Sequence, residues 1–568
     1  MEVSSLSNQR FYHWLEFKEL DSTLKKEMEA MSQEQIADAF DARVEFGTAG
    51  MRGLLGAGSN RLNIYTIRRA TVGFAKYLQE IAKENEPIKV AIGYDNRYMS
   101  KEFALEAAQV LASFDISTVV YSSLRSTPQL SFTVRELGCL GGIMITASHN
   151  PKEYNGYKVY DATGCQLVPS AIEKVIKYVD AIEDELAINI NLSKSQVNLI
   201  HWIDHEIDRL YKSRVLDIQL RPELIKDIQI VFSPQHGAGF PTVFDVLNAA
   251  GYQTLLVQEQ CDPDPAFSNT KSPNPEEKVA YEKSIELAKQ VQADIIISTD
   301  PDADRVGVVV YHHDKYELMS GNQTGSVLIE YLFSTLKEKG LMPPNPVMFN
   351  TIVTSDLGEL VANDYGVETE KTLTGFKFIG EKIEAYQKNK LKSFVLGYEE
   401  SYGYLIEPFV RDKDAVQASL IIAEAAQYYK NQGKTLFDVL LSLYQRHGTF
   451  LETQTSLSLS GIEGSKQIAK IMAKLRSNPL SDFANLAVIK WEDYQQPITI
   501  INNQRQPLLG YALADVIKFY LEDGSWIAVR PSGTEPKCKF YYCIKGENQE
   551  DVNKKFDLFN KEMTLLIS

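Results

Sequence analysis

The chain has 568 residues, of which 44% are hydrophobic and 24% charged, an ordinary composition for a globular protein. At about 100–200 residues per domain, this length predicts about three to five domains. The net charge is −16, from 59 basic and 75 acidic residues, whereas proteins that bind nucleic acid usually carry a basic face. No apolar run approaches the length, about 18 residues, that a membrane span requires. We therefore expect neither nucleic acid nor membrane as a partner.

Five cysteines are scattered along the chain without CxxC spacing. This argues against a disulfide framework and against a structural zinc site. The first residues, MEVSSLSNQRFYHW, lack the basic-then-apolar pattern of a secretory signal. The cytoplasm is the expected location.

Three stretches run from a β-branched strand through a polar loop into an amphipathic helix. The strands are predicted within residues 88–97, 228–237 and 346–355, and the helices within 100–114, 242–252 and 356–367. The first two units return to a strand. Such units favour α/β layers, and in these layers ligands bind where strands end. A further helix start is predicted at Asn274-Pro275, with acidic residues in its first turn.

The predicted fold is therefore three related α/β domains of mixed sheets and a smaller C-terminal α+β domain. The last region differs from the others because it mixes short strands with helices. The expected domains cover residues 1–210, 211–325, 326–445 and 446–568.

In the stretch GGIMITASHNPKEYNGYKVY, a strand-like apolar run from Ile143 to Ile145 ends in a loop that presents a single hydroxyl among polar groups. Ser148 is followed closely by Asn150, Asn155 and Lys158. This arrangement is typical of a nucleophile or phosphate carrier at the end of a sheet. The alternative is an ordinary turn, because Ser, Asn and Pro are common in turns.

An acidic loop, TDPDADR, follows the apolar strand at 295–297. Its carboxylates, Asp300, Asp302 and Asp304, share one face if the loop is extended. Three such charges repel unless a cation neutralises them, and oxygen ligands favour Mg²⁺, Mn²⁺ or Ca²⁺. An EF-hand is excluded, since Arg305 stands where that loop requires glycine. A solvated acidic turn is the plainer alternative.

Three later loops carry weaker signals. Glu399 and Ser401, in GYEES, could bind sugar hydroxyls or form an exposed turn, and Lys377 is the charged residue of the TGFK loop. The loop RPSGTEP offers backbone N–H groups, hydroxyls and an arginine fork, which suit a phosphate. A hairpin turn is its alternative. These last residues are Arg530, Ser532, Gly533 and Thr534.

With TASHNP, DPDADR, GYEES and RPSGTEP in this order, the chain resembles the α-D-phosphohexomutase superfamily. It is most similar to the longer bacterial phosphoglucomutases, a group with phosphopentomutase-like members. The resemblance covers nearly the whole chain and implies four domains, the last of them a lid.

The resemblance also implies roles for individual residues. Ser148 would carry the phosphoryl group, and Mg²⁺ would bind Asp300, Asp302, Asp304 and the phosphate on Ser148. The other residues implied in catalysis are Arg52, Lys158, Arg305 and Lys413. The residues implied in substrate binding are Thr374, Gly375, Phe376, Lys377, Glu399, Ser401, Arg530, Ser532, Gly533, Thr534 and Lys539.

The implied activity is interconversion of α-D-glucose 1-phosphate and glucose 6-phosphate, with glucose 1,6-bisphosphate as intermediate and activator. A monomer or weak dimer is expected. Tyr402 and Gly403 follow the sugar motif where some members have histidine, which weakens a mannose assignment. Mannose or pentose phosphates, or a bisphosphate synthase, remain alternatives. A non-catalytic sugar-phosphate sensor would be expected to lose Ser148 or a metal-loop aspartate.

Overall fold

The computed structural model describes residues 5–47, 50–459, 461–502, 504–532 and 537–567. By its contacts the chain divides into two compact units. The first contains residues 1–321 and 376–435, and the second contains residues 322–375 and 436–568. Within the described ranges, no helix is long and apolar enough to cross a membrane.

The first unit opens with three short helices, α1 (Ser5–Glu16), α2 (Ser22–Glu29) and α3 (Gln33–Phe40). Polar residues start the second and third. Asp21 accepts two N–H groups of α2, and Ser32 forms a capping box with Gln35 in α3. The helices bury a small aromatic core around Trp14 and Phe40, which Tyr65 joins from later in the chain.

A six-stranded mixed sheet follows, in the order β1-β5-β4-β2-β3-β6. Its strands are β1 (Met51–Leu54), β2 (Lys89–Tyr94), β3 (Ser117–Tyr121), β4 (Gly141–Ile145), β5 (Tyr154–Asp161) and β6 (Ile200–Ile203). Strand β2 runs parallel to β3 and β4, whereas β5 is antiparallel to β4 and β1. The serine loop is thus the connection between two antiparallel neighbours, β4 and β5.

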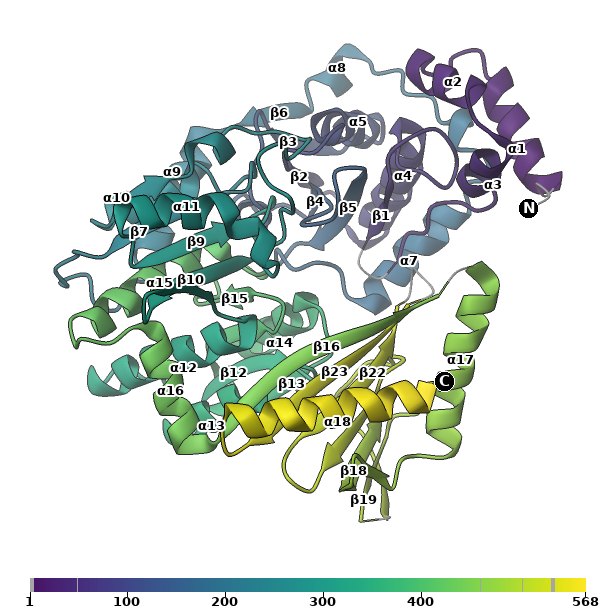
Figure 1. Ribbon diagram of the computed structural model, residues 1–568. Helices are drawn as coiled ribbons and strands as arrows, with labels where there is room; N and C mark the ends of the chain where they lie inside the picture. The colour runs from purple at the N-terminus through teal and green to yellow at the C-terminus, as the bar shows by residue number, and fades with distance from the viewer. Residues whose placement is uncertain (1–4, 48–49, 460, 503, 533–536, 568) are drawn as a thin grey trace. The chain divides into compact units, whose positions relative to one another are not determined.

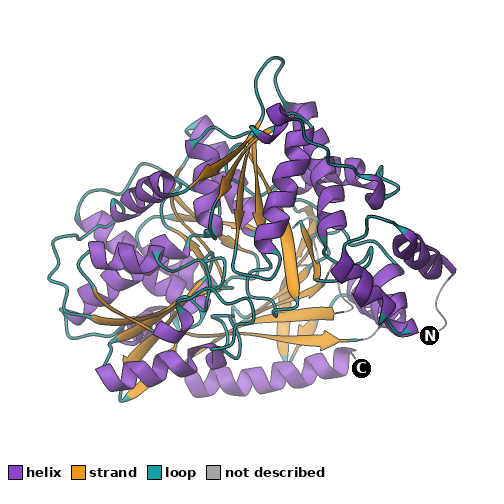
Figure 2. Ribbon diagram, turned by 90° about the horizontal axis from the view of Figure 1, so that it is seen from above, coloured by secondary structure: helices purple, strands orange, loops and turns teal. Residues whose placement is uncertain are grey.

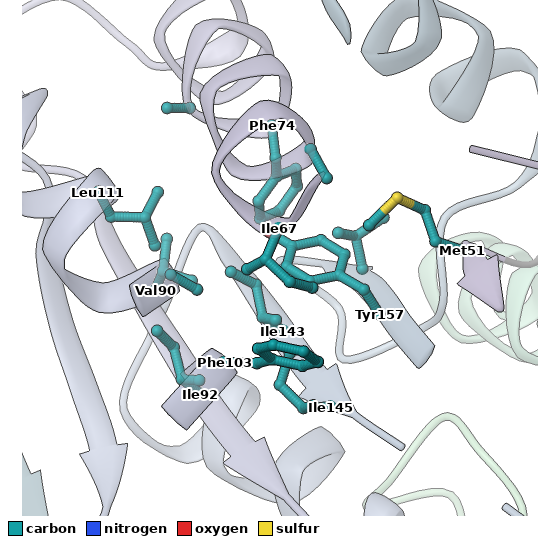
Figure 3. Close-up of a cluster of buried hydrophobic side chains, with 14 of the residues drawn as sticks. Met51, Ile67, Phe74, Val90, Ile92, Phe103, Leu111, Ile143, Ile145 and Tyr157 are labelled. Atoms are coloured by element: carbon teal, nitrogen blue, oxygen red, sulfur yellow. The ribbon is translucent and has the colours of Figure 1, made fainter. Parts of the chain in front are cut away.

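Helices cover both faces of this sheet (Figures 1 and 2). They are α4 (Ile64–Ile81), α5 (Ser100–Ser113), α6 (Thr127–Glu136) and α7 (Pro169–Asp180), while the short α8 (Lys194–Val197) packs on α5 and α9 (His205–Leu216) packs on α6. Alternate strand residues face opposite sides: Ile143 and Ile145 join the core beneath α4 and α5, shown in Figure 3, and Met144 joins the core with α6. Burial on both faces explains the continuous apolar runs of these strands.

The second sheet of this unit is also mixed, in the order β11-β10-β9-β7-β8. Its strands are β7 (Gln229–Ser233), β8 (Gln253–Leu256), β9 (Ile295–Thr299), β10 (Val306–His312) and β11 (Lys315–Leu318), and its helices are α10 (Thr242–Ala249) and α11 (Glu282–Val291). The helix start predicted at Asn274 is wrong. Asn274 closes a tight turn, accepting the N–H of Glu276, and a 3₁₀ turn (Lys278–Tyr281) precedes α11.

The first unit ends with α14 (Phe376–Asn389), the antiparallel pair β14 (Ser393–Glu399) and β15 (Gly403–Leu405), and α15 (Ala415–Lys430). In the second unit, β12 (Pro346–Thr351) leads through α13 (Asp356–Asp364) to β13 (Glu368–Thr372). These strands are parallel, so the third predicted unit also returns to a strand. The helices α12 (Gly321–Glu338) and α16 (Leu436–His447) flank this segment in the chain.

The C-terminal region is an antiparallel sheet with two long helices. Its strands are β16 (Thr449–Ser458), β17 (Asp482–Phe483), β18 (Leu486–Asp493), β19 (Ile498–Ile501), β20 (Gln504–Pro507), β21 (Ile517–Leu521), β22 (Trp526–Pro531) and β23 (Lys537–Gly546). Helix α18 (Gln549–Ile567) packs on β16 and β23 (Figure 1), and α17 (Gly461–Ser477) also contacts β23. The predicted fold class, mixed α/β sheets plus a smaller α+β domain, is confirmed.

Candidate active site

Ser148 lies just beyond β4 and is buried, with 3% of its surface exposed. Its backbone is left-handed, at φ 51°. The hydroxyl donates to Asp300 Oδ2 at 2.6 Å and lies 3.2 Å from Nδ1 of His149. Burial, reinforced by the charges of Arg305 and Arg52, lowers the pKa of His149 well below its usual range. The side chains of His149 and Asp300 therefore flank the hydroxyl.

The acidic loop turns tightly between β9 and β10. Asp300 Oδ1 accepts the N–H groups of Asp304 at 3.1 Å and Arg305 at 3.0 Å, which closes the turn. One oxygen from each of Asp300, Asp302 and Asp304 lies within 4.8 Å of the others, and all three side chains are buried. The loop thus gathers the three carboxylates that the sequence singled out.

A divalent cation fits this cluster. The Oδ1 atoms of Asp302 and Asp304 are buried and have no hydrogen-bond partner among the described residues. Burial and the charges of Asp302 and Asp304 raise the pKa of Asp300 well above its usual range. Oxygen-only donors suit a hard ion such as Mg²⁺, whose charge would relieve this repulsion.

Two lysines neutralise part of the acidic charge. Lys158 Nζ lies 3.1 Å from Asp302 Oδ2 and 3.7 Å from Asp304 Oδ2. Lys413 Nζ lies 3.1 Å from Asp304 Oδ2 and 3.9 Å from Glu399 Oε2. Burial alone would lower the pKa of Lys413, but the surrounding carboxylates raise it, so this side chain is charged. The structure therefore brings the predicted lysines, the aspartates and a sugar-motif glutamate together.

The two arginines predicted near the phosphate flank the serine and acidic loops. Arg305 pairs with Glu276 at 2.6 Å, and its Nε lies 3.8 Å from Asp304 Oδ1. Arg52, exposed on β1, donates to Asn150 Oδ1 at 2.9 Å. Arg52 thus reaches the loop of Ser148.

The sugar-motif loop lies beside the acidic loop. Glu399 ends β14 and is 6% exposed, and Ser401 is half-buried. The N–H of Val306 donates to the carbonyl of Tyr402 at 3.0 Å. The stem of Lys413 crosses Gly403 so closely that a Cβ there would lie 2.0 Å from Lys413 Cδ. A glycine is therefore required where this lysine passes.

The TGFK loop falls on the division between the two units. Phe376 and Lys377 begin α14, and both are buried; the Phe376 ring lies 5.9 Å from Lys413 Nζ. Thr374 and Gly375 belong to the second unit and are half-buried. Gly375 has φ 114°, a backbone conformation that favours glycine.

The phosphate loop connects β22 and β23 in the second unit. Arg530 and Lys539 are directly opposite in this antiparallel pair, and both are half-buried. Ser532 is also half-buried, whereas Gly533 and Thr534 lie outside the described residues. An arginine and a lysine thus stand side by side at the base of the loop.

Residue patterns alone did not reveal two residues at this site. Thr127 begins α6 and donates to Asp302, and Glu276 pairs with Arg305. Thr127 has a partial signal, since Ser126 and Pro128 mark a helix start after a strand. Glu276 has none, because its partner lies 29 residues away along the chain.

Four family models match consecutive parts of the chain. They describe phosphoglucomutase/phosphomannomutase α/β/α domains I, II and III at residues 43–186, 207–313 and 320–447, and the C-terminal domain at 467–552. Together they cover most of the chain.

Curated relatives and solved structures agree with these models. The chain is 39% identical over 548 residues to phosphoglucomutases of Staphylococcus aureus strains RF122 and USA300, covering 96% of this chain and 97% of those proteins. It is similar in fold to a phosphoglucomutase/phosphomannomutase family protein of Burkholderia thailandensis (TM-score 0.67, 16% identity, 92% and 98% of the chains). It is also similar to the Paramecium phosphoglucomutase parafusin (TM-score 0.65, 19% identity, 93% and 94%).

Proposed function

Because the chain belongs to the phosphoglucomutase/phosphomannomutase family, we propose that it is a phosphoglucomutase. It interconverts α-D-glucose 1-phosphate and glucose 6-phosphate through a phosphoserine and an enzyme-bound glucose 1,6-bisphosphate. We infer that glucose phosphates are the substrates rather than mannose or pentose phosphates. The ground for this inference is that the relatives at 39% identity are phosphoglucomutases.

One observation carries the proposal. The Ser148 hydroxyl is buried 2.6 Å from a carboxylate of the acidic cluster, with lysines on the other carboxylates. A phosphoserine carries about −1.5 to −2 charges at neutral pH, so it needs cations close by. Lys158, Lys413, Arg305 and Arg52 supply positive charge.

In the first transfer, the phosphoryl group leaves Ser148 Oγ and bonds to O6 of glucose 1-phosphate, while O6 loses its proton and Ser148 Oγ takes one up. The resulting bisphosphate reverses its orientation. In the second transfer, the phosphoryl group on O1 bonds to Ser148 Oγ, while Oγ loses its proton and O1 takes one up, which gives glucose 6-phosphate. Phosphoryl transfer is mostly positioning and electrostatic stabilisation, which buried, paired cations provide.

Asp300, Asp302 and Asp304 would hold one Mg²⁺, with Ser148 or its phosphate as a further ligand. When bound, the ion would neutralise the charge that develops on the transferring phosphoryl oxygens. Because the three aspartates are buried and tightly held, the ion's place is built into the loop before substrate binds.

We assign the remaining predicted residues to the sugar and to its second phosphate. Glu399 and Ser401 bind hydroxyls, since a carboxylate and a hydroxyl accept either orientation of a near-symmetric intermediate. The TGFK loop, Thr374, Gly375, Phe376 and Lys377, contacts the sugar. The non-reacting phosphate is held by Arg530, Ser532, Gly533, Thr534 and Lys539.

A coupled assay for glucose 6-phosphate tests the proposal, with glucose 1-phosphate, Mg²⁺ and a trace of glucose 1,6-bisphosphate as activator. We expect turnover that Ser148→Ala abolishes while its circular dichroism matches the wild type. Retained activity in Ser148→Ala would refute the role of the serine. Mannose 1-phosphate and ribose 1-phosphate are assayed beside it. A preference for either would change the assigned substrate and leave the proposed phosphoryl-transfer mechanism unchanged.

A further inference from the structure

Arg97 follows β2 and donates all four of its terminal N–H groups to the serine loop, the segment after β4 that contains Ser148. Its Nη1 donates to the carbonyls of Pro151 at 2.8 Å and Tyr154 at 3.0 Å. Its Nη2 donates to the carbonyls of Ser148 at 2.5 Å and of Asn150. One side chain thus satisfies four carbonyls within seven residues, among them the buried carbonyl of Ser148, which needs such a partner.

The guanidinium is itself held in place. Its fifth N–H, on Nε, faces Asp95 Oδ2 at 3.4 Å, and both side chains are fully buried. The other oxygen of Asp95 accepts from Ser100 Oγ at 2.7 Å. The ring of Phe267 lies 5.2 Å from the guanidinium carbon. The position of Arg97 is therefore fixed, and its hydrogen bonds in turn fix the position of the serine loop.

The hydrogen bonds from Arg97 hold a residue with a strained backbone, Ser148. A left-handed backbone, such as that of Ser148, is unfavourable for a non-glycine residue and persists only when its surroundings enforce it. The N–H of Ser148 donates to Thr146 Oγ1 at 2.8 Å, and Arg97 binds its carbonyl. The two contacts hold the peptides on both sides of Ser148, which aims Oγ at Asp300.

We propose that Arg97 is a positioning residue for phosphoryl transfer, which fixes the serine loop and thereby the direction of the Ser148 hydroxyl. This inference rests on the proposed function. Arg97 acts through backbone carbonyls of the protein, so it should govern kcat more than KM. A misplacement of about 1 Å at a reacting group can cost on the order of 10²-fold in rate.

The test is Arg97→Lys. Lysine keeps the charge but has three donors on one atom, so it cannot reproduce the planar fork. We expect kcat to fall on the order of 10²-fold, with KM for glucose 1-phosphate within about twofold. Hydrogen exchange of peptides covering residues 146–156 should speed up. The matched control is Arg69→Lys, a buried arginine of α4 paired with Asp180, which should lower the melting temperature and leave kcat unchanged.

Asp95→Asn is the second variant and is used where Arg97→Lys does not fold. It removes the charge facing Nε and keeps the oxygen that accepts from Ser100, so a smaller loss of kcat is expected. Wild-type kcat in either folded variant, or unchanged exchange of residues 146–156, would overturn the proposal. If the wild type itself fails to convert glucose 1-phosphate, the proposed function fails, and hydrogen exchange alone decides the role of Arg97.

Discussion

Thr127 donates two hydrogen bonds to Asp302: its Oγ1 to the carboxylate Oδ2 at 2.9 Å, and its N–H to the backbone carbonyl, also at 2.9 Å. Thr127 is the first residue of α6, and Asp302 belongs to the acidic loop after β9. A helix that packs on the first sheet therefore orients a carboxylate delivered by the second. Groups that orient ligands in this way commonly set metal affinity.

Thr127→Val should weaken metal binding while leaving the fold intact. Valine matches the shape of threonine and removes the hydroxyl, so Asp302 loses one donor and keeps the N–H of residue 127. We expect Mg²⁺ or Mn²⁺ affinity to fall on the order of 10–100-fold, measured by titration calorimetry of the intact chain. Thr127→Ser restores the donor and should bind metal as the wild type does. Equal affinity in the valine and serine variants would show that the hydroxyl does not orient Asp302.

Metal removal should abolish activity and lower thermal stability. Treatment with EDTA leaves three buried carboxylates that repel one another. Burial strengthens this repulsion because the protein interior screens charges less than water does. Mg²⁺ added at a hundred times its dissociation constant contributes about 2.7 kcal/mol to the folded state. We expect turnover and the melting temperature to recover together on adding Mg²⁺, followed by assay and scanning fluorimetry.

Asp300→Asn separates metal binding from folding. The amide keeps an oxygen to accept the N–H groups of Asp304 and Arg305, and it removes one of three repelling charges. The metal-free variant should therefore melt no lower than the metal-free wild type, yet gain no stability from Mg²⁺ and show no turnover. A metal-free variant that melts several degrees lower would mean that this carboxylate serves the fold rather than an ion.

Gly403→Ala should displace Lys413 although no charged residue is itself replaced. The new Cβ would lie 2.0 Å from Lys413 Cδ, so the lysine stem must move from the acidic loop. We expect kcat to fall roughly 10- to 100-fold. Because the effect passes through one side chain, Gly403→Ala should add little in a Lys413→Met background, whereas independent effects would add. Full additivity in this double-mutant cycle would contradict the explanation.

Much of the fold could be predicted because local patterns and tertiary structure agree. The strands predicted within 88–97 and 228–237 appear as β2 and β7, and the helices after them as α5 and α10. Asn274 marks the limit of such reasoning. Proline and acidic residues favour a helix there, but Glu276 is occupied by Arg305, a partner that local sequence does not reveal.

The residues of the candidate site also divide into those that the sequence could predict and those that it could not. Ser148 and the aspartates could be predicted because each group occupies a short segment after an apolar strand. Arg97 and Thr127 could not, since their importance lies in contacts 51 and 175 residues away along the chain. The roles of the site residues and the four domain boundaries remain predictions.

The C-terminal sheet contains a lysine in an unusual environment. Lys518, on β21, is fully buried; its Nζ donates to the carbonyl of Ile352 at 2.7 Å and lies 3.9 Å from the ring centre of Trp526. Burial is the largest cause that lowers the pKa of Lys518 to about 7, and the positive charge of Lys371 is the second. Asp356 and Glu492 act in the opposite direction but do not compensate. Compared with the unfolded chain, the folded chain therefore favours the neutral amine.

This depressed pKa predicts how stability depends on pH. Between about pH 7 and the ordinary lysine value near 10.4, the unfolded chain binds the proton that the folded chain has lost, so stability rises with pH. Below about pH 7 both states are protonated, and the cost of burying the charge is fully felt. Lys518→Met removes this pH-dependent contribution and also removes the hydrogen bond to the Ile352 carbonyl, whose loss does not depend on pH. The free energy of unfolding of the wild type should therefore rise relative to Lys518→Met from pH 7 to 9.5, measured in urea. Parallel curves for the two proteins over this range would show that Lys518 keeps an ordinary pKa.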